Sequence, residues 1–156
     1  MSILLAARAE QFPERTAIVA PEGIFTYRQL LDASHRVASF LLDGAEDLKE
    51  RPVAFLVPPG FHYVVVQWGI WRASGIAVPL SLFHPRPELD YVLGDTSPAA
   101  VIAHPDFAPL VAPLATERGL RFGLTIAALD HHPPSRRSSR ARVADKNSEF
   151  LGGHYV

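Results

Sequence analysis

The sequence predicts an α/β fold in which helices cover both faces of a doubly wound, mainly parallel β-sheet. Short apolar runs alternate along residues 1–130 with longer segments whose apolar residues recur at helical spacing. The run at 52–57 is apolar throughout, which is typical of a strand buried on both faces. Because consecutive parallel strands need crossovers between them, this alternation favours a parallel sheet between two helical layers. A chain of 156 residues, 48% of them hydrophobic, is long enough for one such domain.

The first part of the chain predicts a helix, a strand and a second helix. Residues 1–12 favour a plain helix over a signal peptide, because no basic region precedes their apolar patch. Residues 17–20 predict a short strand closed by a Pro-Glu-Gly turn. The helix at 25–44 has the strongest local signals: Thr26 can cap its first turn, and Gln29 follows at the spacing of a capping box. Its apolar residues repeat at helical spacing, so we expect one face to be buried.

The middle of the chain predicts three strands joined by two helices. The strands are expected at 52–57, 76–80 and 99–103, and the helices at 61–75 and 85–95. The helix at 61–75 is apolar nearly all round, so we expect it to be deeply buried. Trp68 and Trp71 lie on it, and core packing accounts for them better than stacking on a ligand. A weaker helix, interrupted by Pro113, is expected at 106–119, and a final strand at 121–126.

The tail at 131–156 differs in kind from the domain at 1–130. It carries 5 Lys and Arg against 2 Asp and Glu, whereas the domain carries 10 against 14. It shows no period of 2 or 3.6 and is rich in Ser, Arg, Pro and Gly, so we expect it to be disordered. Ser139 in RRSSR suits a basophilic kinase, and the four arginines suit phosphate contacts. Since the domain has no basic surface of its own, a solvated end is favoured over a nucleic-acid partner.

The residues present argue against several kinds of site. There is no cysteine, which excludes disulfides and thiolate metal sites and allows a reducing compartment. No apolar run reaches the roughly 20 residues that span a bilayer. No Gly-rich loop ends in Lys, and the scattered histidines, among them His62 and His104, show no zinc spacing, so we expect no metal. We expect a cytoplasmic protein, with mitochondria as the alternative because Arg8 and Arg15 suit an organelle-targeting segment.

Three segments of the domain together resemble one enzyme superfamily. They are FTYRQL at 25–30, GIWRASGIAVPLS at 69–81 and HPRPELDYVLGDTSPAAVIA at 84–103. In this order and spacing they are similar to the opening of adenylate-forming enzymes, which include acyl-CoA synthetases, peptide-synthetase adenylation domains and luciferases. The stretch VVVQWGIWRASGIAVPL most resembles acyl-CoA synthetases of the malonyl-CoA synthetase type. The resemblance covers about residues 3–125.

The resemblance implies a two-step ligase that uses ATP, Mg and CoA. Such enzymes convert a carboxylate to an acyl-adenylate with release of pyrophosphate, and then transfer the acyl group to CoA. The loop at 81–85 lies near the CoA channel in relatives, which makes Ser81 and His84 candidate cofactor-binding residues. The family's phosphate loop and C-terminal domain have no counterpart in this sequence, so no catalytic residue is carried over. The resemblance therefore implies a truncated AMP-dependent synthetase that is inactive alone and needs no cofactor by itself.

Three functions are open at this point, and the least favoured is a nucleic-acid binder that acts through the tail at 131–156. For a truncated ligase, the expected partner is the missing portion of the synthetase. The alternative is a non-catalytic module that binds another protein through the open edge of its sheet. Migration of the chain as a stable, well-folded lone monomer would count against this module.

Overall fold

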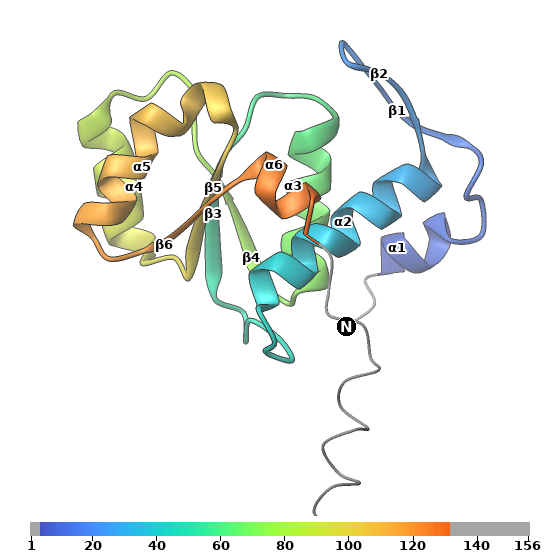
Figure 1. Cartoon of the computed structure of the whole chain (residues 1–156), viewed down its shortest axis with the longest axis horizontal. Coiled ribbons are helices and arrows are strands. Elements are labelled where there is room, and N and C mark those ends of the chain that lie inside the picture. The colour runs from blue at the N-terminus through green and yellow to red at the C-terminus, as the bar shows by residue number, and fades with distance from the viewer. Residues whose placement is uncertain (1–3, 132–156) are drawn as a thin grey trace, which may run out of the picture.

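The computed structural model describes residues 4–131, and a four-stranded parallel sheet forms its centre (Figure 1). The strands are β3 (Pro52–Leu56), β4 (Ile76–Pro79), β5 (Ala100–Ala103) and β6 (Arg121–Leu124). They lie in the order β4-β3-β5-β6, and each neighbouring pair is parallel. None of the helices in this part of the chain is long and apolar enough to cross a membrane. The predictions for the tail at 132–156 fall outside the described residues.

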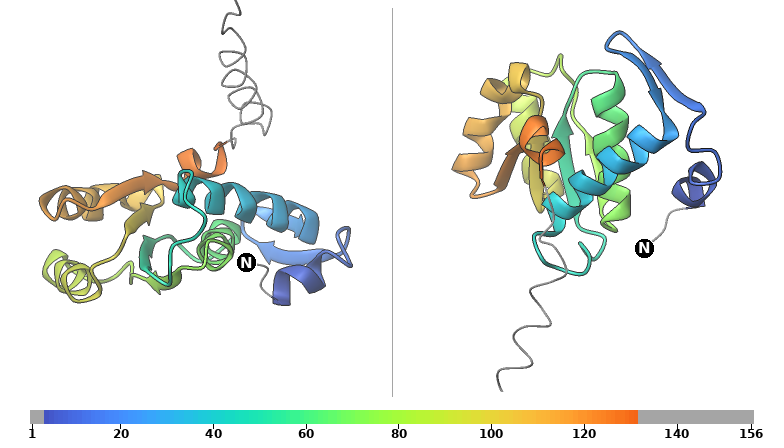
Figure 2. Two further views of the ribbon diagram at one scale, coloured as in Figure 1. Left: turned by 90° about the horizontal axis from the view of Figure 1, so that it is seen from below. Right: turned by 45° about the vertical axis from the view of Figure 1, so that its right-hand side comes forward.

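Helices cover both faces of the sheet, which confirms the predicted doubly wound α/β fold. One face carries α2 (Tyr27–Leu42), α3 (Phe61–Arg72) and α6 (Thr125–Leu129), and the other carries α4 (Arg86–Thr96) and α5 (Ala108–Glu117). In Figure 1, α4 and α5 lie to the left of the strands, and α2 and α3 lie to the right. The turned views of Figure 2 show the same layers.

Alternate residues of the central strands point into the two halves of the core. Val53, Phe55 and Ile102 pack with α2 and α3, while Leu56 and Val101 pack with α4 and α5. All five side chains are fully buried. Burying a side chain of this size stabilises the fold by about 1.5–3 kcal/mol. The unbroken apolar run at the central strand is therefore explained by burial on both faces.

The chain changes faces of the sheet between its two central strands. α3 follows β3 on one face and leads to β4, whereas α5 follows β5 on the opposite face and leads to β6. The loops after the neighbouring strands β3 and β5 therefore leave the sheet in opposite directions. In open α/β sheets, ligands bind at such a point, beyond the carboxyl ends of the strands. This edge is the first place to expect a site.

The N-terminus of α2 has the capping box that the sequence predicts. The Gln29 N–H donates to Thr26 Oγ1 (3.3 Å), and the Thr26 N–H donates to Gln29 Oε1 (2.8 Å). The helix ends where Asp43 adopts a left-handed conformation with φ of 47°. Along its length α2 packs closely against α3, since Gly69 of α3 leaves no room for a side chain beside Val37 of α2.

The strand predicted at 17–20 exists but does not belong to the parallel sheet. β1 (Thr16–Ala20) pairs antiparallel with β2 (Gly23–Thr26), which the sequence analysis did not predict. The two strands form a separate hairpin near α1 (Leu4–Ala9), at the right of Figure 1. The end of the predicted turn and the first residues of the predicted helix belong to β2. A four-residue strand is too short for its period of 2 to be recognised.

The last two elements also differ from the prediction. The strand predicted at 121–126 ends at residue 124, and Thr125 is the first residue of α6. Because Thr125 is fully buried, tertiary packing outweighs the β-propensity of the Thr–Ile pair. The helix predicted at 106–119 consists of a 3₁₀ turn, η1 (Pro105–Phe107), followed by α5, which continues through Pro113.

Candidate functional site

The four parallel strands end at one edge of the sheet, and backbone hydrogen bonds continue past two of them. The N–H of Leu80 donates to the carbonyl of Phe55 (2.9 Å), and the N–H of His104 donates to the carbonyl of Leu56 (3.0 Å). The residues that directly follow β4 and β5 are therefore held beside the end of β3. We call this region, from which the loops after the strands leave, the carboxyl edge.

Ser81 and His84 lie in one tight turn at the carboxyl edge, between β4 and α4. The His84 N–H donates to the Ser81 carbonyl (3.3 Å), and the Phe83 N–H donates to Ser81 Oγ (3.2 Å). The Ser81 hydroxyl accepts this bond and can still donate its own proton. His84 Nε2 lies 3.6 Å from Glu88 Oε2, which is longer than a hydrogen bond, and both side chains are exposed. The structure thus places both predicted residues in one turn, with polar groups free to meet a ligand.

Phe83 is a third member of this turn that the sequence analysis missed. Its side chain is 94% exposed, although a large apolar ring usually finds cover in a folded domain. Periodicity could not reveal it, since the residues between β4 and α4 follow neither a helical nor a strand pattern. An exposed ring beside a free hydroxyl offers an apolar contact and a hydrogen bond to the same ligand.

The helix that follows the turn is fixed to its neighbour by two ion pairs. Arg86 of α4 pairs with Glu117 of α5, and the Arg118 Nε donates to Asp90 Oδ1 (2.7 Å). The hydrogen bond from Arg118 holds the pKa of the Asp90 carboxyl below its ordinary value. These contacts are partly exposed, so each one stabilises the fold only modestly. Together they hold α4 in place at the base of the turn.

A second pair of side chains meets where the chain changes faces of the sheet. The ring centroid of His62, on the first turn of α3, lies 6.5 Å from that of His104, which follows β5. The Asp106 N–H donates to His104 Nδ1 (3.3 Å), so the proton of the neutral ring lies on Nε2. Asp106 Oδ2 is also 3.5 Å from Nδ1, but this contact is an ion pair only when His104 is protonated. Within residues 4–131 no three acidic or histidine side chains are grouped as metal ligands.

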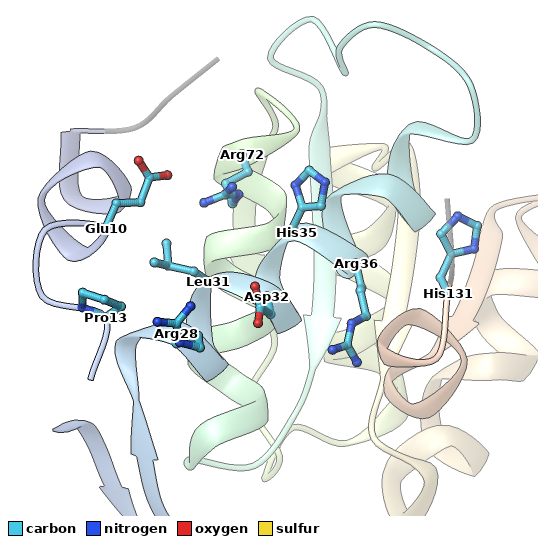
Figure 3. A pocket seen from close by; sticks show the side chains of 9 residues that line it. All are labelled: Glu10, Pro13, Arg28, Leu31, Asp32, His35, Arg36, Arg72 and His131. Atoms are coloured by element: carbon cyan, nitrogen blue, oxygen red, sulfur yellow. The ribbon is translucent and has the colours of Figure 1, made fainter. Parts of the chain in front are cut away.

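A groove of about 570 Å³ lies between the start of the chain and helices α2 and α3 (Figure 3). It is lined by Glu10, Pro13, Arg28, Leu31, Asp32, His35, Arg36, Arg72 and His131. Two of its arginines already have partners, since Arg28 pairs with Glu14 and Arg36 Nη1 donates to the Leu129 carbonyl (3.3 Å). The groove carries both signs of charge, and neither Ser81 nor His84 lines it. The carboxyl edge therefore remains the candidate site that the fold and the sequence both support.

Comparison with known proteins gives the same family as the sequence segments. The protein-family model for the AMP-binding enzyme family matches residues 5–150. The mitochondrial malonate–CoA ligase ACSF3 of Xenopus laevis is 34% identical over 148 residues, which are 92% of this chain and 25% of that protein. The Homo sapiens protein of the same name is 37% identical over 117 residues, covering 72% of this chain and 20% of its own length.

The fold comparison agrees. The crystal structure of apo MatB from Rhodopseudomonas palustris matches with a TM-score of 0.70 at 25% identity, and the match covers 85% of this chain and 29% of MatB. The chain thus spans about a quarter of the length of the relatives that it matches. Since the family match runs through nearly all of its residues, the chain belongs to the family of AMP-binding enzymes.

Proposed function

We propose that this chain forms part of the N-terminal domain of an AMP-forming acid–CoA ligase whose acid substrate is malonate. The observation that carries the proposal is the likeness to malonate–CoA ligases along nearly the whole chain. The malonate assignment rests on this likeness.

The proposed reaction has two steps and uses ATP, Mg and CoA, as the family does. The malonate carboxylate attacks the α-phosphorus of ATP, which forms the acyl-adenylate and releases pyrophosphate. The CoA thiol then attacks the acyl carbon, and AMP leaves. The first step needs cationic groups that stabilise charge on the phosphates in the transition state.

This chain contributes the scaffold and one wall of the CoA channel to that reaction. We assign the wall to the turn of Ser81, Phe83 and His84. Its free hydroxyl and its exposed ring fit a ligand such as the arm of CoA, which combines amide groups with methylene groups. In this assignment Ser81 donates a hydrogen bond to the arm, Phe83 covers its apolar part, and His84 borders the channel entrance.

Residues 1–156 by themselves are not expected to form the adenylate. The sequence contains no Ser/Thr/Gly-rich loop that ends in Lys, and such a loop supplies the cationic clamp on the phosphates. The resemblance places this loop soon after the segments that match. Catalysis therefore requires further residues of the synthetase, and these are the partner we expect for this chain.

An ATP–pyrophosphate exchange assay tests both parts of the proposal. The first sample is the purified chain with malonate, for which we expect exchange at the background level. The second is a graft, in which residues 4–131 of this chain replace the matching segment of the human ligase. We expect malonate-dependent exchange by the graft. Exchange by the isolated chain would overturn its assigned inactivity. A folded graft without malonate-dependent exchange would overturn the assignment of this chain to the N-terminal domain of such a ligase.

The assignment of the turn is tested by separating the two half-reactions in the graft. Ser81→Ala and Phe83→Ala are expected to raise the KM for CoA several-fold and to leave malonate-dependent pyrophosphate exchange unchanged. Ser97→Ala is the matched control, because Ser97 closes the opposite end of α4. An unchanged KM for CoA in both variants would remove the turn from the channel.

Two alternatives remain to be weighed against this proposal: a non-catalytic binding module, and the cytoplasm as the compartment. Only enzymes are among the relatives described above, so the comparisons do not favour the non-catalytic binding module. The names of the two ligases favour mitochondria over the cytoplasm as the compartment. Imaging of the full gene product with a C-terminal fluorescent tag checks this, and a diffuse cytoplasmic signal would contradict it.

A further inference from the structure

A second pocket, of about 440 Å³, lies beside α1 and is separate from both the carboxyl edge and the groove of Figure 3. Its walls include Leu5, Arg8, Phe12, Arg15, Tyr27 and Trp68. None of the lining residues is acidic. We call it the α1 pocket. Its volume lies within the roughly 300–1,000 Å³ that is usual for small-molecule sites.

Two arginines of the α1 pocket lie over the same aromatic ring. The guanidinium carbons of Arg8 and Arg15 are 5.1 and 4.8 Å from the centroid of the Phe12 ring. Within this range an aromatic ring attracts a guanidinium group and helps to hold it in place. Arg8 Nη1 also donates to Gln11 Oε1. The groups that position these two guanidinium groups, Phe12 and Gln11, are uncharged. They therefore do not neutralise the positive charges of Arg8 and Arg15.

The nearby carboxylates do not neutralise these arginines. Glu14 is paired with Arg28, and Glu10 lines the groove of Figure 3 instead of the α1 pocket. The ion pairs that the described residues form involve neither Arg8 nor Arg15. Because the residues that line the α1 pocket include two arginines and no acidic side chain, the pocket keeps a net positive charge.

Aromatic side chains complete the walls. Tyr27 is the first residue of α2, and Trp68 belongs to α3. Both pack against the main core, as the sequence predicts for Trp68, and both also line the α1 pocket. Beside the Phe12 ring, over which the two arginines lie, they give the pocket two further rings; Arg8 and Arg15 supply two guanidinium groups that form no ion pair among the described residues. Rings of this kind stack on flat ligands, and arginine binds carboxylate or phosphate through paired N–H groups.

We propose that the α1 pocket binds a small ligand that joins a flat ring to an anionic group. The ring packs against the aromatic walls, and Arg8 and Arg15 bind the anion. A mononucleotide and an aryl carboxylate both have this chemistry. The inference does not rest on the proposed ligase function, because the pocket shares no residue with the turn of Ser81 and His84.

Calorimetric titration of the full 156-residue chain with phenyl phosphate tests the proposal. Inorganic phosphate lacks the ring, and phenol lacks the anion. We expect saturable binding of phenyl phosphate at least tenfold tighter than that of either fragment. Equal affinity for phenyl phosphate and inorganic phosphate, or no binding of phenyl phosphate, would overturn it. Titrations with AMP and with benzoate then show which source of the ring and anion is preferred.

Variants locate the binding in the α1 pocket. The exposed side chains of Arg8 and Arg15 can be replaced without disturbing the core, so Arg8→Gln/Arg15→Gln should keep its fold, as circular dichroism checks. We expect the double variant to weaken phenyl phosphate binding more than tenfold. Lys49→Gln removes an exposed charge elsewhere and should leave the affinity unchanged. Equal affinity in the double variant and the parent would place the ligand at another site and contradict the proposal.

Discussion

The contact between α2 and α3 makes a sharp prediction for Gly69→Ala. A Cβ atom at this position would lie 2.5 Å from Val37 Cγ1, 2.6 Å from Val37 Cβ and 3.1 Å from the Ser34 carbonyl oxygen. Carbon atoms normally approach no closer than about 3.5 Å, so the two helices must separate by roughly 1 Å. Val37 cannot move aside, because it is fully buried and its branched side chain has essentially one rotamer in a helix.

The expected change is the difference between two opposing terms. Overpacking of a well-packed core costs about 1–3 kcal/mol. Alanine in place of glycine within a helix returns roughly 0.5–1 kcal/mol. The two ranges leave a net loss of about 0–2.5 kcal/mol, and because the contacts with Val37 are as short as 2.5 Å we expect Gly69→Ala to lower the free energy of unfolding by the upper part of this range, about 1–2.5 kcal/mol. Urea denaturation followed by tryptophan fluorescence measures this, since both tryptophans lie on α3.

Gly94→Ala is the matched control within another helix. There the new Cβ would meet only the guanidinium end of Arg118, at 2.9 Å; that side chain can move away at the loss of its partly exposed ion pair with Asp90, which the helix propensity of alanine offsets. We expect this variant to unfold within about 0.5 kcal/mol of the parent. If Gly69→Ala were as stable as Gly94→Ala, the close packing of α2 on α3 described above would be wrong.

Three further predictions concern single side chains. Thr26→Ala removes the cap of α2 and should lower the free energy of unfolding by about 0.5–2 kcal/mol; an unchanged denaturation midpoint would contradict the capping role. Thr125→Val replaces a buried hydroxyl that has no hydrogen-bond partner among the described residues. It should therefore raise the free energy of unfolding by about 1 kcal/mol. Thr116→Val is the control at an exposed position and should not raise it. Because its pKa is lowered in the fold, Asp90 stabilises the protein above its ordinary pKa of about 3.9 and loses this effect as the pH falls through the lowered value. The melting temperatures of the parent and Asp90→Asn should therefore differ at pH 7 and draw together as the pH falls below the ordinary range of a carboxyl group. A difference that stays constant down to acid unfolding would refute the linkage.

Most of the central sheet could be predicted because its signals are local. The apolar run around Phe55 identifies a strand buried on both faces, and Thr26 with Gln29 marks the start of α2. The β1–β2 hairpin was missed because its second strand is short and runs directly into a helix. The end of β6 was misplaced because burial of Thr125, and not its propensity, decides where α6 begins.

The candidate sites depend more strongly on tertiary structure. Ser81 and His84 were predicted through a family resemblance, and the fold adds the exposed ring of Phe83 between them. His62 and His104 lie far apart in the sequence, and only the adjacency of β3 and β5 brings their rings together. The α1 pocket likewise combines three separate segments, so no spacing pattern in the sequence could reveal it.

The most direct test of the proposed function is malonyl-CoA formation by the graft of residues 4–131 in the human ligase. The same graft made from the matching segment of MatB controls for the junctions. With ATP, Mg and CoA present, we predict malonyl-CoA production within about tenfold of the MatB graft, a loss of at most about 1.4 kcal/mol in transition-state stabilisation. A soluble, folded graft that makes no malonyl-CoA, beside an active MatB graft, would contradict the assignment of this chain to the N-terminal domain of an acid–CoA ligase.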